Sequence, residues 1–135
     1  MTTSVVLSNS GNSIQAPWAL AFDTSGDLWS SNANAPFTVV EFSAKQLDAS
    51  GSPAPVITLS PGSDGGNATL AAPNGIAFDN IGGLSAVSSA TPFGVAVFGA
   101  GQLKASGAVT PATLVVGPDT TLNAPAGDTF GPVVN

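Results

Sequence analysis

The sequence predicts an all-β fold built from two copies of a four-stranded unit. Residues 15–55 and 71–111 align without a gap at an offset of 56 residues and share eighteen identities. Gly, Pro, Asn and Asp cut each copy into short runs that are rich in β-branched and aromatic residues, as strands are. A repeat of this length indicates a supersecondary unit that buries its faces by stacking on copies of itself.

Each copy is predicted to contain four strands. In the first copy they span residues 18–23, 27–33, 37–44 and 55–60, and in the second they span 74–79, 83–90, 93–100 and 111–116. The run FTVVEFSA at 37–44 has the strongest strand signal, because β-branched and aromatic residues dominate it.

A short helical turn is expected between the third and fourth strands of each copy. Residues 44–50 tolerate a helix and are followed by Gly51, while Gly107 ends the matching segment. Glycine is the usual residue at a left-handed helix terminus. We expect Leu47 and Leu103 to pin these turns against the strands.

Both faces of the third strand are apolar in the second copy. Phe93, Val95 and Val97 share one face, and Gly94, Ala96 and Phe98 share the other. A sheet that is apolar on both faces must be covered on both. The neighbouring repeats are the natural covers, which is the arrangement of β-propeller blades.

Residues 16–32 and 39–42 resemble the NHL-type blade of β-propellers and its gluconolactonase-like and streptogramin-lyase-like relatives. The matching pattern is Ala-Pro-x-x-Leu-Ala-Phe-Asp-x-x-Gly-x-Leu-Trp-x-x-Asn, followed by Val-Val-Glu-Phe. The second copy keeps most of it but has Ser85 in place of Trp29 and Ser88 in place of Asn32. The resemblance implies β-propeller-like four-stranded blades, with Trp29 in the core.

The repeat continues past both copies. Residues 4–7 (SVVL) resemble a fourth strand, and residues 124–130 restart a first strand with Phe130 at the position of Phe78. The predicted organisation is a trailing strand and loop at 1–14, repeats at 15–70 and 71–122, and a leading strand at 123–135. Two blades do not close a propeller, so we expect the propeller to be incomplete within one chain.

Several copies of the chain are therefore expected to assemble, although a place within a longer chain is the alternative. The expected assembly interface contains Val5, Val6 and Leu7 at one end and Phe130, Val133 and Val134 at the other. A head-to-tail contact gives a closed ring or an open filament according to its rotation, and the sequence leaves that choice open.

Composition limits the partners. Charged residues make up 7% of the chain, whereas ordinary soluble domains contain about 25%. The net charge is −6. No nucleic-acid partner is expected, because such a partner requires clustered cations and the chain has only two Lys and Arg residues in total. No membrane insertion is expected, because no apolar run is long enough to span a bilayer. The surface suits contact with copies of itself, and an extracellular or cell-surface location is expected.

No enzyme activity, catalytic residue, cofactor or metal ligand is expected. His and Cys are absent, which excludes His-dependent lyase chemistry and the usual nucleophile–base pairs. Asp23 and Asp79 are either metal ligands or caps of the turns that follow, and capping is favoured because Gly131 stands at the third equivalent position. Glu41 is expected to be partly exposed at a blade edge.

Three further features of the sequence are candidates for binding. Asp64 and Asp119 lie in loops and are either calcium ligands or ordinary loop residues, the latter being favoured. Asn67 begins an N-glycosylation acceptor pattern in a loop. Trp18 is a candidate for stacking on a ligand such as a glycan, although packing is favoured for it.

The sequence thus favours a non-enzymatic, self-assembling structural module held by blade stacking and strand pairing. One alternative is a propeller that binds a glycan or a small ligand. Another is a fragment of a larger propeller enzyme of the gluconolactonase-like type.

Overall fold

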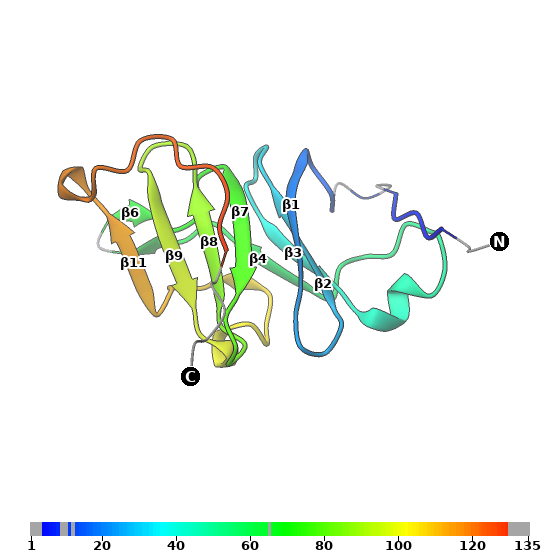
Figure 1. Ribbon diagram of the computed structural model, residues 1–135. Helices are drawn as coiled ribbons and strands as arrows, with labels where there is room; N and C mark the ends of the chain where they lie inside the picture. Colours follow the sequence, from blue (N-terminus) through cyan, green and yellow to red (C-terminus); the bar gives the residue numbers. More distant parts are fainter. Residues whose placement is uncertain (1–3, 9–10, 12, 65, 130–135) are drawn as a thin grey trace.

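A computed structural model describes residues 4–8, 11, 13–64 and 66–129, and it is all-β as predicted. Two twisted sheets stand side by side, and the described residues do not close them into a ring (Figure 1). The first sheet has the order β1-β2-β3-β4-β10, and the second has the order β11-β9-β8-β7.

Each of the eight predicted strands is present, with ends shifted by a few residues. The first copy forms β1 (Pro17–Phe22), β2 (Leu28–Asn32), β3 (Val39–Phe42) and β4 (Ile57–Ser60). The second copy forms β7 (Pro73–Phe78), β8 (Leu84–Ser88), β9 (Gly94–Phe98) and β11 (Thr113–Val116). Within each copy, neighbouring strands pair antiparallel.

The remaining elements are short. A small hairpin pairs β5 (Ser63–Asp64) with β6 (Asn67–Ala68), and β10 (Gly107–Ala108) adds to β4 in parallel. The turns η1 (Ala44–Leu47) and η2 (Ala100–Gln102) confirm the expected helical segments, and η3 (Pro118–Thr120) follows β11. No helix in the described part of the chain is long and apolar enough to cross a membrane.

Asp23 and Asp79 cap the turns between the first and second strands, as favoured from the sequence. The Ser25 and Asp27 amides donate to Oδ1 of Asp23 at 2.8 and 3.1 Å. In the second copy, the Ile81 and Gly83 amides donate to Oδ1 of Asp79 at 2.9 and 2.7 Å. A short carboxylate side chain holds such a turn by accepting amides ahead of it.

The main core lies between the two sheets. The inner face of the first sheet carries Trp29, Val39 and Leu59, and the facing side of the second carries Leu84 and other apolar residues; all are buried. The Trp29 and Phe78 rings meet edge to face with centroids 5.7 Å apart, a favoured geometry for aromatic pairs. Trp29 therefore has the core position that its resemblance implied.

Two expectations from the sequence are wrong. Glu41 is only 7% exposed, and it lies in β3 with a strand on either side rather than at an edge. Trp18 is 64% exposed rather than packed. Trp18 lies in the edge strand β1 and Glu41 in the inner strand β3. The alternation of the sequence did not show which faces of these strands are covered.

Candidate functional site

The outer face of the first sheet is open along β1, where its repeat equivalent is closed, while Ser30, Val40 and Phe42 on β2 and β3 are buried. We call this the front face; it contains Leu20, Phe22, Leu28, Ser30, Val40, Phe42 and Thr58, which share one side of β1–β4. Residues 56 positions later form the inner face of the second sheet. Leu20 is 64% exposed, whereas its equivalent Ile76 is 5% exposed, because the first sheet covers Ile76.

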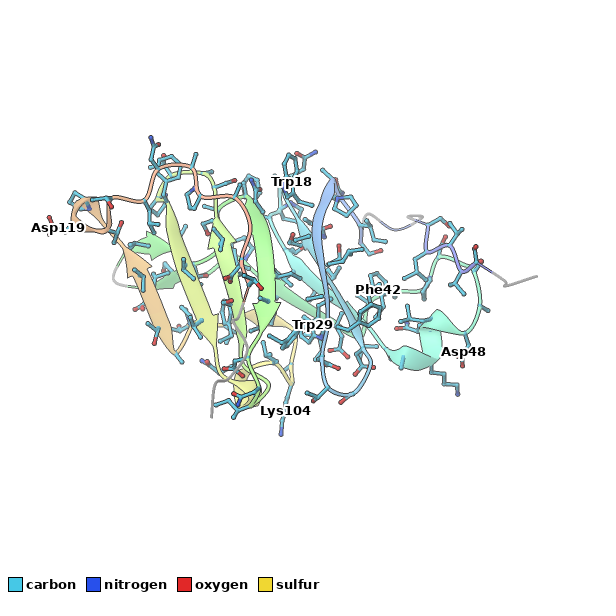
Figure 2. The ribbon with its side chains drawn as sticks, in the orientation of Figure 1. Trp18, Trp29, Phe42, Asp48, Lys104 and Asp119 are labelled. Carbon is cyan, nitrogen blue, oxygen red and sulfur yellow. The ribbon has the colours of Figure 1, made fainter. Side chains whose placement is uncertain are left out.

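The outer face of the second sheet shows the converse. We call it the rear face; it contains Gly75, Ala77, Ser85, Val87, Val95, Val97, Thr113 and Val115. Val115 is 44% exposed, whereas Leu59, its equivalent in the first copy, is fully buried between the sheets. The exposed positions Leu20 and Val115 are thus equivalent to positions that are buried inside the chain, although Ser85 and Val87 on the rear face are themselves buried. Figure 2 shows Trp29 directed between the sheets and Phe42 on the opposite side of the first sheet.

The N-terminal segment lies beside the first sheet as β4 lies beside the second, so that Val6 corresponds to Thr58 and Leu7 to Leu59. The Val6 amide donates to Oγ of Ser50 at 2.9 Å, and the Thr58 amide donates to Oγ of Ser106 at 3.0 Å. Leu7 forms an isolated parallel bridge with Gly51, and Leu59 pairs in parallel with Gly107. Residues 4–8 therefore occupy the position of a fourth strand ahead of the first sheet, as expected, with a single bridge instead of a full strand.

A pocket of about 260 Å³ lies between the N-terminal segment and the front face. Its lining residues are Val5, Leu7, Ile14, Pro17, Leu20, Leu28, Ser30 and Phe42. Their repeat equivalents, which include Ile57, Leu59, Leu70 and Phe98, are buried residues of the main core. The lining of the pocket thus matches one side of the main core. The pocket lacks the facing side chains, which in the main core are Trp29 and Val39.

The segment after residue 123 follows the start of a further first strand. Ala16, Ala72 and Ala124 open the three equivalent stretches with φ of 47°, 48° and 46°, a region that residues other than glycine rarely adopt. The Asp128 carboxylate accepts a hydrogen bond from Oγ of Ser85 on the rear face. Residues 124–129 form no strand in the structure, and Phe130 lies outside the described residues.

Three equivalent stretches also line one pocket. Residues 18–20, 74–76 and 126–128 surround a volume of about 410 Å³. Trp18 is the aromatic residue at this pocket, and Asn74 and Asp128 are its polar side chains. The structure therefore places the exposed Trp18 ring at a cavity with polar groups, an arrangement that suits a small ligand.

The other predicted site residues are distributed as follows. Val6 is 60% exposed and Val5 is 39% exposed, while Leu7 is half-buried. Phe130, Val133 and Val134 lie outside the described residues. Asn67 begins β6 rather than lying in a loop, Asp64 lies in β5 and Asp119 lies in η3. The described residues contain no cluster of three or more acidic, His or Cys side chains that could hold a metal ion.

Sequence reasoning missed Leu20 and Phe22, which are 64% and 62% exposed on the front face. The signal was present in the repeat, because Ile76 and Phe78 at the equivalent positions of the second copy lie against the first copy, whereas no sheet in the described part of the chain lies against Leu20 and Phe22. Comparison of the chain with family models, with curated proteins and with solved structures gave no match.

Proposed function

We propose that this chain is a non-enzymatic structural module that assembles with copies of itself. Its two sheets are blades of the NHL propeller type, and the front face of one copy meets the rear face of the next. The terminal segments lie between the two faces, at the positions of a fourth and a first strand. The assembly works at the cell surface or outside the cell.

The observation that carries this proposal is the pairing of open and buried faces. The front face is equivalent to a surface that the first sheet covers in the second copy, as Leu20 and Ile76 show. The rear face is equivalent to a surface that the second sheet covers in the first copy, as Val115 and Leu59 show. A neighbouring copy, together with the terminal segments, supplies both missing covers.

The chemistry of the two faces favours association. Burial of a Leu or Phe side chain stabilises a contact by about 1.5–3 kcal/mol, and Leu20 and Phe22 are both largely exposed. The front face contains no ionisable residue, and neither do the rear-face strands. No like charges therefore oppose the contact, whereas ordinary soluble domains use surface charge to stay apart.

The contact joins two different surfaces, so it is heterologous and extends from copy to copy. The layer between two copies contains a first strand from one chain and a fourth strand from the next, without the second and third strands. Its thickness differs from that of a full sheet. The rotation between copies, which decides between a ring and a filament, is therefore set by this layer.

Two matched variants test the proposal. A front variant (Leu20→Asp with Phe22→Asp) keeps an intact rear face, and a rear variant (Val115→Asp) keeps an intact front face. We expect the wild-type chain to form large species in sedimentation and electron microscopy, and each variant alone to remain monomeric. An equimolar mixture is expected to form 1:1 dimers, because one intact front face and one intact rear face remain. Ile81→Ser, which removes an 81% exposed apolar side chain from a turn, serves as the control and should assemble like the wild type.

The pattern of results separates the alternatives. Dimers of the front variant alone would indicate a rear-to-rear contact, and dimers of the rear variant alone would indicate a front-to-front contact. A wild-type chain that stays monomeric at high concentration would refute self-assembly. Electron microscopy of the wild type distinguishes a closed ring from a filament.

A second candidate function is binding of a glycan at the Trp18 pocket. An exposed indole beside a pocket with amide and carboxylate groups is suited to a sugar, which presents an apolar face and hydroxyl groups. Trp18→Ala should abolish retention on a glycan array and leave the assembly unchanged. If no glycan is retained by the wild type, this function is excluded.

A further inference from the structure

A second kind of site lies between the two sheets, at the end where the Asp23 and Asp79 turns are found. A pocket of about 480 Å³ opens there, within the usual size range of small-ligand sites. Its polar lining includes Asp23, Asp27, Glu41 and Lys104, and its aromatic lining is Trp29 and Phe78. Figure 2 shows Trp29 between the sheets and Lys104 at their lower edge.

The Glu41 carboxylate is the unexplained group in this pocket. Its residue is only 7% exposed, and it lines the pocket from the middle of β3, beside Trp29 and Ile57 on the neighbouring strands. No group in the described part of the chain donates a hydrogen bond to its side chain. The Glu41 oxygens are not among the fully buried polar atoms without a partner in the described residues, so they face the open space of the pocket. They are therefore free to accept hydrogen bonds from a ligand.

The neighbouring carboxylates are already occupied. Asp23 accepts from the Trp29 indole N–H at 3.2 Å and from two turn amides, and Asp27 accepts from the Ala44 amide at 2.7 Å. Burial, followed by the negative charges of Asp27 and Asp23, raises the pKa of Glu41. The pocket therefore has excess negative charge and one side chain that is free to accept donors.

The fold does not require an acid at this position. The repeat equivalent of Glu41 is Val97, which occupies the same place in β9, and the equivalent of Asp27 is Gly83. Trp29 and Lys104 are likewise not repeated, since Ser85 and Asp48 are their counterparts. The combination of acids and aromatic rings is thus specific to the space between the two sheets.

We propose that this pocket binds a small organic ammonium ion, whose N–H donors engage Glu41 and whose apolar body lies against Trp29 and Phe78. An ammonium group provides the donors and the positive charge that Glu41 lacks. The aromatic walls provide contact for an apolar body, and aromatic rings also attract cations. A bare metal ion fits less well, because the described residues contain no cluster of three acidic, His or Cys ligands.

The first test uses 2-phenylethylammonium as the probe and 2-phenylethanol as its neutral counterpart. We expect calorimetry to show binding of the ammonium ion and at least tenfold weaker binding of the alcohol. In nuclear magnetic resonance spectra, the Trp29 indole N–H signal should move on binding, since this group donates to Asp23 at the pocket wall. The signal of the exposed Trp18 indole should stay in place.

Variants identify the group responsible. Glu41→Gln keeps the shape of the side chain and should weaken binding of the ammonium ion at least tenfold. Asp119→Asn, which neutralises an exposed carboxylate in η3, should leave binding unchanged. Because the comparison of the two probes uses the wild-type chain alone, the proposal stays testable even if Glu41→Gln does not fold.

The pH dependence provides a separate reading. The charged groups facing Glu41 are Asp23, Asp27 and Lys104. The probe stays cationic below about pH 9, so its affinity should rise with pH as Glu41 ionises at its raised pKa. This rise should disappear in Glu41→Gln.

Equal affinity for the ammonium ion and the alcohol, an unshifted Trp29 signal, or unchanged binding by a folded Glu41→Gln variant would each overturn the proposal. Calcium or potassium ions that displace the probe at equal concentration would show a general cation site instead. The pocket lies within one chain, so these results are independent of whether the copies assemble.

Discussion

Leu20 and Ile76 occupy the same position of the repeat in β1 and β7, yet Leu20 is 64% exposed and Ile76 is 5% exposed. The backbone positions are alike, and the difference arises because the first sheet covers Ile76 while no sheet covers Leu20. Comparing these two residues therefore shows how much a covering sheet adds to the free energy of unfolding.

Truncation of the two residues should therefore have unequal effects on the isolated chain. Ile76→Ala is expected to lower the free energy of unfolding by about 2–5 kcal/mol, the usual cost of removing a buried aliphatic side chain. Leu20→Ala should change it by less than about 0.5 kcal/mol. Urea denaturation at low protein concentration measures both values. If Leu20→Ala becomes as costly as Ile76→Ala at high concentration, a second copy covers it there.

Asn32 joins the second strand to the segment that precedes the first repeat. Its Nδ2 donates to the Ser13 carbonyl and to Oγ1 of Thr38 at 2.9 and 2.8 Å, and its Oδ1 accepts from the Gln15 amide at 2.9 Å. Asn32→Ala should destabilise the chain by about 1–3 kcal/mol, because buried polar partners are left unsatisfied.

The second copy offers a matched control, since Ser88 at the equivalent position accepts only from the Ala71 amide, at 3.0 Å. Ser88→Ala should therefore be less costly than Asn32→Ala in the same thermal denaturation series. Equal losses for the two variants would contradict this assignment.

Gly75 allows the segment 124–129 to approach the rear face. A Cβ atom at this position would lie 2.6 Å from the carbonyl carbon of Gly127. We expect Gly75→Ala to displace residues 126–129 and to break the hydrogen bond from Ser85 to Asp128, while β7 and β8 stay paired. Faster amide exchange at these four residues, with a loss of stability of about 1 kcal/mol, is the expected result. Gly101→Ala is the control, because a Cβ there meets no atom within 4 Å.

Glu41 should make the stability of the chain fall as pH rises. Its pKa is raised above the ordinary value of 4.5 by burial and by the Asp27 and Asp23 charges. The folded state therefore holds the proton more tightly than the unfolded state, and stability declines from pH 4.5 upward through the raised pKa. Glu41→Gln should flatten this decline and raise the melting temperature at pH 7, whereas Asp119→Asn should not. Melting temperatures between pH 4 and pH 8 test this directly.

Local features of the sequence predicted much of the fold. Turn residues and runs of β-branched and aromatic residues predicted eight strands. Helix-tolerant residues before Gly51 and Gly107 predicted the helical turns, and capping was the favoured role for Asp23 and Asp79. These features depend on contacts within a few residues, and so the sequence carries them directly. The parallel pairing of Gly107 with Leu59 was missed, because it joins segments that are distant along the chain.

The candidate sites were predicted less well. Trp18 and Trp29 lie in the same repeat, and packing was favoured for both, yet only Trp29 is buried. Glu41 was placed at an exposed edge, although both neighbouring strands and the second sheet surround it. Burial depends on which sheet lies opposite, and strand alternation contains no information on that point.

The sequence by itself thus determined the repeat, the strands and the turns of this protein, because each depends on backbone propensity and neighbouring side chains. Only the tertiary structure decided which of two equivalent positions is covered, because cover comes from a sheet far away in the chain. That decision leaves Leu20 open, buries Ile76 and places Glu41 without a partner between the sheets.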